Sequence, residues 1–400
     1  MSSHASDERR FEAPELRPLR IEMIVPSLVA AGMEMIVARL TRGLAHRGHE
    51  VAVTCIVSGG VLADELRAEG HRVTIVPVPG LRSNMFPTQL AEWLRSRKPS
   101  VVHAHSGVWL KAARAAHLAG VPHVVYTVHG IEGKDPWFIK PMWWMAVRYT
   151  DLVVSVSKPL VRYLHGDMRL PRERLRLVAN GVDTDRFRPA ARGEAVRAAL
   201  GFGAGGLLVG NVARLAKVKN HALLIDAFAI LRRQVPEARL TIVGEGPERR
   251  ALEERVDALA LAPDARLVGA LYDMPPVYRE LELYVLSSHM EGTSVSILEA
   301  MASGVCVVAT AVGGTPELLG QGRFGVLVPP DDPPALAAAM AGLLRDPRRR
   351  RTLAAAAREH VVGHHSELAM VQRYEELYYG LAAPARASGA RPPREGVCVE

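Results

Sequence analysis

The chain has 400 residues, of which 48% are hydrophobic and 23% are charged, a composition that excludes a disordered protein and predicts two domains of about 150 to 200 residues each. Its three cysteines lie far apart in the sequence, which excludes a disulfide framework and a cysteine-rich metal site. The formal net charge of +8 is spread along the chain, and aromatic residues make up only 5% of it. Basic clusters interleaved with aromatics are absent, so nucleic acid is not an expected partner.

Both ends of the chain are polar. Residues 1–18 lack the apolar segment of a secretory signal, and residues 384–400 are rich in Pro, Arg and Gly. We expect a disordered arm and a disordered tail. No apolar run approaches the ~20 residues of a membrane span, and we expect a protein of the reducing cytoplasm.

Apolar runs alternate with helix-forming stretches through the first half of the chain. The expected strands are residues 19–25, 51–57, 73–76, 101–104, 124–128, 152–156 and 175–178. Runs of Val, Ile and Leu without alternating polar residues are typical of strands that are buried on both faces of a sheet. Residues 19–185 are therefore predicted to form a doubly wound parallel-sheet domain.

The pattern breaks and then restarts. After a turn at residues 180–183 and a glycine-rich stretch, further strands are expected at residues 207–212, 240–243, 266–268, 283–286, 305–309 and 325–328. We predict a second domain of the same type over residues 186–365, followed by a helix over residues 366–383 that packs back on the first domain. The fold class is thus α/β, with two tandem Rossmann-like domains and a cleft between them. Such sheets bind ligands beyond the carboxyl ends of their strands.

Two basic residues follow the first strand of the second domain. Arg214 and Lys219 flank a loop between this strand and an amphipathic helix. A helix N-terminus attracts anions through its unpaired N–H groups, and two cations there would hold a diphosphate and stabilise it as it leaves. Two solvated basic residues in a loop are the alternative interpretation.

Two acidic residues near the end of the chain stand eight positions apart. Glu291 is followed by Gly292, Thr293 and Ser294 and then by an apolar helix start that contains Glu299. In a continuous helix the two would lie about 12 Å apart, more than the roughly 5 to 9.5 Å between carboxylates that act on one glycosidic bond. The spacing suits the two ends of an elongated ligand such as a nucleotide-sugar. A capped surface helix with two solvated acids is the alternative interpretation.

Glycines mark other loops that follow predicted strands. Gly313 and Gly314 form a turn before a short helix, where the backbone could approach a phosphate closely. Gly244 and Gly246 follow another strand and could border a nucleotide base. Gly32 permits a tight turn between the first strand and the first helix, beside a phosphate or sugar.

Two features of the first domain have more than one interpretation. His129 ends a predicted strand and could hydrogen-bond a sugar hydroxyl, although a single histidine at a strand end is more often structural. Residues 137–149 combine three tryptophans and Phe138 with Lys140 and Arg148. Such a segment suits docking on a membrane surface, a helix packed on the sheet, or a wall of an acceptor pocket.

Taken in order, these features resemble the retaining nucleotide-sugar glycosyltransferases with the GT-B fold, in the large family marked by an E-x7-E motif. The resemblance extends over about residues 19–382. It rests on pieces that occur in the family's order: Gly32, Gly48 to Val51, His129 with Gly130, Ser155 to Lys158, Asn180 to Asp183, Arg214 with Lys219, Gly244 to Pro247, Glu291 to Glu299, Gly313 to Glu317 and Gly325 to Val328.

The resemblance implies a role for each candidate residue. The catalytic residues would be His129, Arg214, Lys219 and Glu291. The donor-binding residues would be Gly32, Gly244, Gly246, Gly292, Thr293, Ser294, Glu299, Gly313 and Gly314. Within these sets, Arg214 and Lys219 would hold the diphosphate and Glu299 the ribose hydroxyls. Glu291 would contact the transferred sugar, and His129 would border it from the opposite domain.

The resemblance also implies the reaction. A hexosyl group would pass from a nucleotide-sugar, with UDP or GDP as the expected carrier, to a hydroxyl acceptor with retention of configuration. The acceptor would be a growing polysaccharide or a glycolipid, and a lipid-linked acceptor would bring the protein to the inner face of the membrane. No metal and no cofactor would be required, because the nucleotide-sugar is a substrate. An Asp183-Thr184-Asp185 sequence imitates a metal-binding motif but lies in the interdomain turn.

The sequence departs from the family pattern at two positions, and two other functions remain open. Ala31-Gly32 replaces the family's frequent glycine pair, and Lys219-Asn220 replaces a Lys-Gly pair, but neither change removes a charged group. A sugar-nucleotide 2-epimerase would share the architecture without the E-x7-E arrangement. A non-enzymatic hinged sugar-binding protein would normally carry an export signal and would not need a diphosphate cradle.

Overall fold

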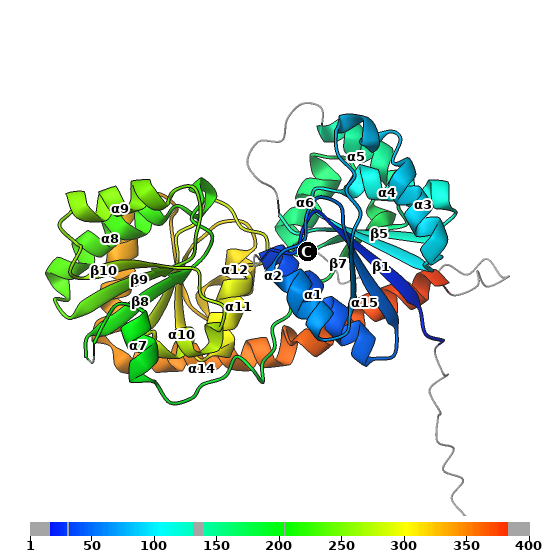
Figure 1. Ribbon diagram of the computed structural model, residues 1–400. Coiled ribbons are helices and arrows are strands. Elements are labelled where there is room, and N and C mark those ends of the chain that lie inside the picture. Colours follow the sequence, from blue (N-terminus) through cyan, green and yellow to red (C-terminus); the bar gives the residue numbers. More distant parts are fainter. Residues whose placement is uncertain (1–16, 30–31, 131–138, 204, 383–400) are drawn as a thin grey trace, which may run out of the picture.

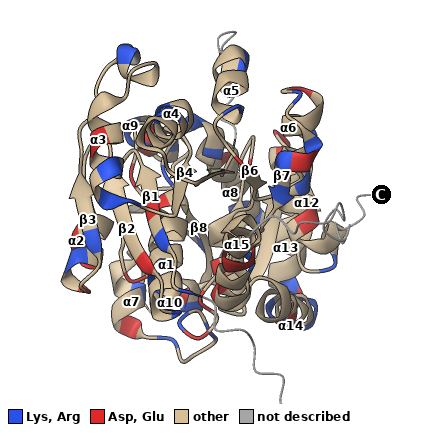
Figure 2. Ribbon diagram, turned by 90° about the vertical axis from the view of Figure 1, so that its right-hand side faces the viewer, with Lys and Arg blue, Asp and Glu red and all other residues tan. Residues whose placement is uncertain are grey.

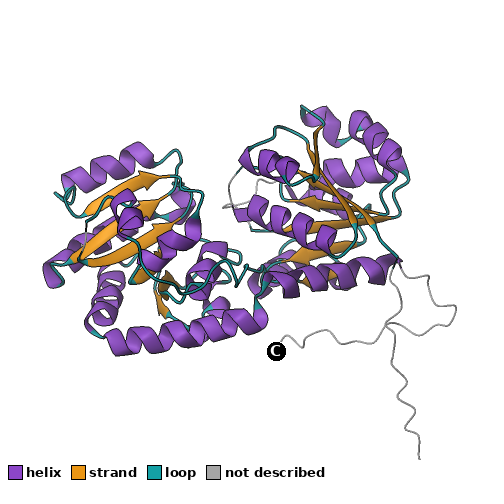
Figure 3. Cartoon of the chain, turned by 60° about the horizontal axis from the view of Figure 1, so that its bottom comes forward, coloured by secondary structure: helices purple, strands orange, loops and turns teal. Residues whose placement is uncertain are grey.

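The computed structural model describes residues 17–29, 32–130, 139–203 and 205–382. Within these ranges the chain forms two α/β lobes, each built around one parallel sheet with helices on both faces (Figure 1 and Figure 3). The predicted arm and tail lie outside the described residues, apart from the last two positions of the arm. This architecture confirms the predicted α/β class with two tandem Rossmann-like domains.

The first lobe contains a seven-stranded parallel sheet in the order β3-β2-β1-β4-β5-β6-β7. Its strands are β1 (Arg20–Val25), β2 (Glu50–Cys55), β3 (Arg72–Ile75), β4 (Val101–His105), β5 (His123–Val128), β6 (Leu152–Ser155) and β7 (Leu175–Leu177). In β1 every residue from Ile21 to Val25 is buried, as expected for a strand covered on both faces. Continuous apolar runs were therefore a sufficient signal for these strands.

The second lobe contains a six-stranded parallel sheet in the order β10-β9-β8-β11-β12-β13. Its strands are β8 (Leu207–Val212), β9 (Ala238–Val243), β10 (Ala265–Gly269), β11 (Leu283–Leu286), β12 (Cys306–Thr310) and β13 (Val326–Val328). In both sheets the strand order reverses next to the first strand of the lobe, between β1 and β4 and between β8 and β11. Loops leave opposite faces of the sheet at such a switch point, and the crevice between them is where doubly wound sheets bind ligands.

Helices cover both sheets. The first lobe has α1 (Gly32–His46), α2 (Val61–Ala68), η1 (Leu81–Asn84), α3 (Thr88–Arg97), α4 (Trp109–Ala119), α5 (Ile139–Val147), α6 (Lys158–Gly166) and η2 (Arg172–Arg174). The second has α7 (Glu194–Ala199), η3 (Lys217–Lys219), α8 (His221–Gln234), α9 (Arg249–Ala258), α10 (Met274–Glu280), α11 (Val295–Ala302), α12 (Thr315–Leu318), η4 (Gly320–Gly322), α13 (Pro333–Arg345) and α14 (Pro347–His364). The last helix, α15 (Glu367–Ala382), returns to the first lobe.

The chain crosses between the lobes twice, and the two crossings lie side by side. Val182 pairs in parallel with Ser366, the Val182 N–H donates to the His365 carbonyl (2.9 Å), and the Glu367 N–H donates to the Val182 carbonyl (2.9 Å). Beyond this point α15 packs on α1, where a Cβ on Gly43 would lie 2.5 Å from a methyl group of Val371. The two lobes are thus joined by a narrow double connection with α14 beneath one lobe and α15 beneath the other (Figure 1).

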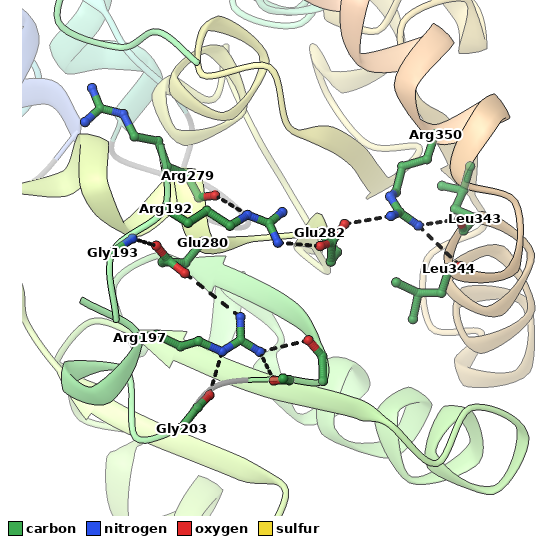
Figure 4. A network of polar contacts seen from close by, with 12 residues as sticks. Arg192, Gly193, Arg197, Gly203, Arg279, Glu280, Glu282, Leu343, Leu344 and Arg350 are labelled. Carbon is green, nitrogen blue, oxygen red and sulfur yellow. Dashed lines mark hydrogen bonds and ion pairs between the residues drawn. The ribbon is translucent and has the colours of Figure 1, made fainter. Parts of the chain in front are cut away.

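A polar network fastens the segment after the first crossing to the second lobe (Figure 4). The Glu282 carboxylate accepts from Arg192 (2.6 Å) and from Arg350 of α14 (2.6 Å). Burial would raise the pKa of Glu282, but these two guanidinium groups hold it below its ordinary value. Next to it, the buried Glu280 accepts from the Gly193 N–H (2.6 Å). The network makes α7 and α14 parts of the second lobe, so movement between the lobes must occur at the crossings.

The charged residues are distributed over many elements. In the side view of Figure 2, segments with Lys or Arg alternate with segments with Asp or Glu on the helices of both lobes. None of the helices among the described residues combines the length and the apolar character that a bilayer crossing needs.

Candidate functional site

The loop after β8 presents a cation at the switch point of the second lobe. The Arg214 side chain is exposed, and within the described ranges no side chain or carbonyl pairs with its guanidinium group. The base of the loop is fixed, because the buried Asn211 amide donates to the Val285 carbonyl (2.7 Å) and its oxygen lies 2.9 Å from His221 Nε2. Arg214 is therefore an available positive charge on a rigid support.

Lys219 lies at the end of the same loop and is paired with Glu291. Lys219 Nζ lies 2.6 Å from Glu291 Oε1, and the hydroxyl of Ser288 donates to the same oxygen (2.6 Å). The Ser287 hydroxyl donates to the Lys219 carbonyl (3.1 Å), which ties the loop after β8 to the loop after β11. In the part of the chain that the structure describes, no residue donates to Glu291 Oε2, the second oxygen of this carboxylate.

Glu299 is enclosed on helix α11. Ser294 caps this helix, with its hydroxyl accepting from the Ile297 N–H (3.4 Å). Glu299 is only 7% exposed; its Oε1 accepts from Arg39 (2.7 Å) and its Oε2 from the Tyr278 hydroxyl (3.0 Å). Because α11 begins after Glu291, the distance expected for a continuous helix does not apply. The enclosure of both carboxylates also shows that the solvated-acid interpretation is wrong.

The glycines after Glu291 and after β12 allow two loops to touch through their backbones. A Cβ on Gly313 would lie 1.8 Å from the Glu291 carbonyl oxygen, and one on Gly314 would lie 2.2 Å from that of Gly292. A Cβ on Gly292 would in turn lie 2.3 Å from the carbonyl oxygen of His129 in the first lobe. These three residues therefore set the position of the Glu291 loop, whatever else they bind.

Two other predicted glycines support the cationic loop. A Cβ on Gly244 would lie 1.9 Å from the Ala213 carbonyl oxygen, and one on Gly246 would lie 2.3 Å from that of Leu215. By contrast, no atom of the described residues lies within 4 Å of the Cβ position of Gly32, the first residue of α1. Close backbone packing thus explains Gly244 and Gly246, whereas no contact with a described residue explains Gly32.

His129 belongs to a group of three histidines at the carboxyl ends of β4 and β5. His129 Nε2 lies 2.9 Å from His105 Nδ1, and the rings of His103 and His105 lie 4.1 Å apart. Burial lowers the pKa of His129 and of His103 to about 3, and burial with the neighbouring rings lowers the pKa of His105 well below its ordinary value. His129 is therefore neutral at pH 7, and it is a hydrogen-bonding group rather than a cation.

The two lobes meet directly at this site. The hydroxyl of Thr293 donates to the Val156 carbonyl (2.5 Å), and the Asn180 amide donates to the Thr293 carbonyl (3.0 Å). Lys158, which begins α6, forms an ion pair with Glu317 of α12 (3.4 Å). Elements from both halves of the sequence are thus in direct contact beside the Glu291 loop.

Sequence reasoning missed three side chains of this site. Arg39 and Tyr278 hold Glu299, and Glu34, in the first turn of α1, is buried near Arg214. Burial raises the pKa of Glu34, and the charge of Arg214 opposes this effect. A signal for Arg39 was present, because it stands within a run of apolar residues in α1, residues 36–38 and 40, all of which are buried.

Metal ligands are not assembled in the part of the chain that the structure describes, where no three His, Cys, Asp or Glu side chains come together as a possible metal site. Asp183 instead caps a turn, its Oδ1 accepting from the N–H groups of Asp185 (3.0 Å) and Arg186 (2.9 Å). This geometry agrees with a structural interpretation of the Asp183-Thr184-Asp185 sequence.

Comparisons with known proteins match both halves of the chain. A family model described as "Glycosyltransferase Family 4" matches residues 30–186, and one described as "Glycosyl transferases group 1" matches residues 194–360. The putative glycosyltransferase EpsF of Bacillus subtilis is 30% identical over 261 residues, which cover 62% of this chain and 68% of EpsF.

Other similarities extend this result. A GDP-mannose-dependent alpha-(1-6)-phosphatidylinositol monomannoside mannosyltransferase of Mycobacterium tuberculosis is 31% identical over 287 residues, which cover 66% of this chain and 72% of the relative. The crystal structure of Anabaena HepE in complex with UDP-glucose has a TM-score of 0.80 at 21% identity and covers 90% of this chain and 100% of HepE. The two-lobed arrangement is thus found in solved structures over nearly the full described length.

Proposed function

Because the chain belongs to the family 4, group 1 glycosyltransferases, we propose that it transfers a hexosyl group from a nucleotide-sugar to a hydroxyl acceptor and retains the anomeric configuration. One observation carries this proposal: Arg214 and the Lys219–Glu291 pair lie in the loops that follow the carboxyl ends of β8 and β11, and the Lys219–Glu291 ion pair joins these two loops. This is the switch point, where an open α/β sheet receives its ligand.

The two cations suit a diphosphate leaving group. When the bond between the anomeric carbon and the diphosphate breaks, positive charge grows on the sugar ring and negative charge on the phosphate. Arg214 is unpaired among the described side chains, and Lys219 is held in place by Glu291. Charges that are already in position stabilise the developing charge without reorganisation.

Glu291 suits a sugar hydroxyl better than the anomeric carbon. Its Oε1 is bound by Lys219 and Ser288, which makes the carboxylate a weak nucleophile. We therefore favour attack by the acceptor on the face from which the diphosphate leaves. The acceptor oxygen forms a bond to the anomeric carbon, the bond to the diphosphate breaks, and the acceptor proton passes to the departing phosphate oxygen. Positioning by the two lobes then supplies most of the catalysis.

UDP- and GDP-linked hexoses are the proposed donors. The HepE structure contains UDP-glucose, and the mycobacterial relative is named as GDP-mannose-dependent. The donor is a substrate, so no cofactor is proposed. The transfer is proposed to need no metal, because Arg214 and Lys219 supply the positive charge that the diphosphate requires.

The proposed acceptor is a growing polysaccharide or a lipid-linked sugar. The mycobacterial relative is named for a phosphatidylinositol monomannoside. On the first lobe Phe86 is 71% and Trp144 50% exposed, and Arg114 links their elements through the Met85 carbonyl (2.8 Å) and the Tyr149 hydroxyl (3.1 Å). These side chains support a contact with the inner face of the membrane. Trp137 and Phe138, which were predicted to share this role, lie outside the described residues.

A thermal-shift panel of UDP-, GDP- and ADP-sugars tests the proposal. The correct donor at 100 times its dissociation constant should stabilise the protein by about 2.7 kcal/mol, with and without a chelator. If none of the donors raises the melting temperature, the proposal fails. The main alternative, a sugar-nucleotide 2-epimerase, is tested by incubating a labelled donor without acceptor. An epimerase would release free nucleotide together with an isomerised sugar.

A further inference from the structure

Arg39 connects the hinge to the candidate donor site. It lies on α1 of the first lobe and is only 4% exposed. Its Nη1 donates to the Gly181 carbonyl (3.0 Å) in the first crossing, and its Nε lies 3.8 Å from Glu367 Oε2 in the second. Its Nη2 donates to Glu299 Oε1 (2.7 Å) in the opposite lobe. One guanidinium group therefore contacts both crossings and the carboxylate that is predicted to bind ribose.

Burying the charged Arg39 side chain costs free energy, so its position calls for a functional explanation. Residues around it on α1, such as Ile36 and Leu40, are fully buried apolar residues. A buried ion pair often stabilises a protein no more than apolar side chains of similar size would. The planar fork of an arginine can, however, hold several acceptors in a fixed geometry. This geometry, rather than stability, is what Arg39 adds to the helix.

The Glu299 carboxylate retains capacity for a ligand in spite of its two partners. Each carboxylate oxygen can accept two hydrogen bonds. Arg39 occupies one position on Oε1 and the Tyr278 hydroxyl occupies one on Oε2. Burial raises the pKa of Tyr278 well above its ordinary value, so this hydroxyl stays protonated and remains a donor. The described residues leave one position on each oxygen, which matches the two hydroxyls of a ribose.

We propose that Arg39 is a positioning residue for the nucleotide, which fixes Glu299 from the opposite lobe so that its carboxylate meets the ribose hydroxyls. The inference rests on the proposed function, because it needs a nucleotide donor. It adds that recognition of the ribose requires both lobes.

Isothermal titration with two ligands tests this inference. The ligands are the nucleoside diphosphate that the panel selects and its 2′-deoxy analogue. A hydrogen bond to a charged group corresponds to a preference of about tenfold or more for the ribonucleotide. Arg39→Ala should bring this preference close to one, and Arg39→Lys should keep part of it. Arg42→Ala is the matched control, because Arg42 lies on the same helix and pairs with Glu69 within the first lobe (2.6 Å). The Arg42→Ala variant should prefer the ribonucleotide as strongly as the wild-type protein does.

The outcomes are distinguishable. If Arg39→Ala weakens both ligands equally, Arg39 is only a hinge contact and the inference is wrong. If the variant binds the ribonucleotide more tightly, Arg39 competes with ribose and the inference is also wrong. If Arg39→Ala does not fold, the test uses Arg39→Lys. The inference is then wrong if this variant prefers the ribonucleotide over the 2′-deoxy analogue as strongly as the wild-type protein does. A wild-type protein that binds no nucleoside diphosphate would instead overturn the proposed function itself.

Discussion

At the scale of single residues, the environment of Glu291 decides what this carboxylate can do. Lys219 and Ser288 bind one oxygen, and the other faces no described donor. A carboxylate in this state can accept a hydrogen bond from a sugar hydroxyl, while its bound cation remains close to a diphosphate. In the proposed reaction the same ion pair would serve both ends of the bond that is to be broken.

Replacing Lys219 should affect chemistry more than folding. We expect Lys219→Ala to lower kcat by about 100-fold or more, because a preorganised charge at the leaving group is lost. The melting temperature should fall by only a few degrees. Lys217→Ala is the control, since Lys217 lies exposed in the same short helix. Steady-state kinetics on both variants check this, and an unchanged kcat in Lys219→Ala would show that the diphosphate cradle is wrongly assigned.

The buried histidines make stability depend on pH. The pKa of His103 is lowered to about 3 in the folded protein, whereas the ordinary value is 6.5, so the unfolded chain takes up the proton first as the pH falls. Stability should therefore be complete above pH 6.5 and decline below it, by about 1.4 kcal/mol per pH unit for each such histidine. Urea unfolding at pH 7 and pH 5 measures this loss.

A matched pair of variants tests whether His103 causes this loss of stability at low pH. His103→Gln should reduce the decline between pH 7 and pH 5, whereas His117→Gln, at an exposed position of α4, should leave it as in the wild type. An identical decline in the wild type and in His103→Gln would contradict the assignment.

Residue-level contacts were also the hardest to predict. The loop motifs indicated Arg214, Lys219 and Glu291, because charged residues after apolar strands stand out in the sequence. The bond from Arg39 to Glu299 spans 260 positions and two lobes, and it arises only when the lobes are brought together. Local patterns carry no information on such a pair, beyond the charged residue within an apolar run of the helix.

At the scale of elements, the strands were predictable and the purposes of the loops were not. Continuous apolar runs marked every strand because both faces of each sheet are covered. The glycines after β12 were predicted to allow approach to a phosphate, but the structure shows that Gly313 and Gly314 first allow the approach of the Glu291 loop. A motif identifies where the backbone comes close to something, and the fold decides what that is.

Gly313→Ala tests this packing role. Gly313 has a positive φ of 52°, and an added Cβ would lie 1.8 Å from the Glu291 carbonyl oxygen. We expect a loss of about 1 to 3 kcal/mol in the free energy of unfolding, together with weaker donor binding, because the Glu291 loop must shift. Gly342→Ala, in the exposed interior of α13, should instead be neutral or stabilising by up to about 1 kcal/mol. Equal stability of the two variants would contradict the packing argument.

At the scale of the whole molecule, two lobes with the same topology place their switch points opposite each other. The second lobe contributes Arg214, the Lys219–Glu291 pair and Glu299, and the first contributes neutral His129 and the guanidinium group of Arg39. The narrow double crossing at Val182 and Ser366 is the natural axis for movement between them. Two tandem domains could be predicted from the repeated strand pattern. The position of Arg39 between this axis and the candidate donor site could not be predicted in this way.

The most direct test of the central claim compares the affinities of a nucleoside diphosphate and the corresponding monophosphate, measured by isothermal titration. The wild-type protein should bind the diphosphate at least about tenfold more tightly, because the second phosphate gains charge-assisted bonds from Arg214 and Lys219. The Arg214→Ala/Lys219→Ala double variant should bind the two nucleotides with nearly equal affinity. If the double variant keeps the wild-type preference, the diphosphate is held elsewhere and the account of this site is wrong.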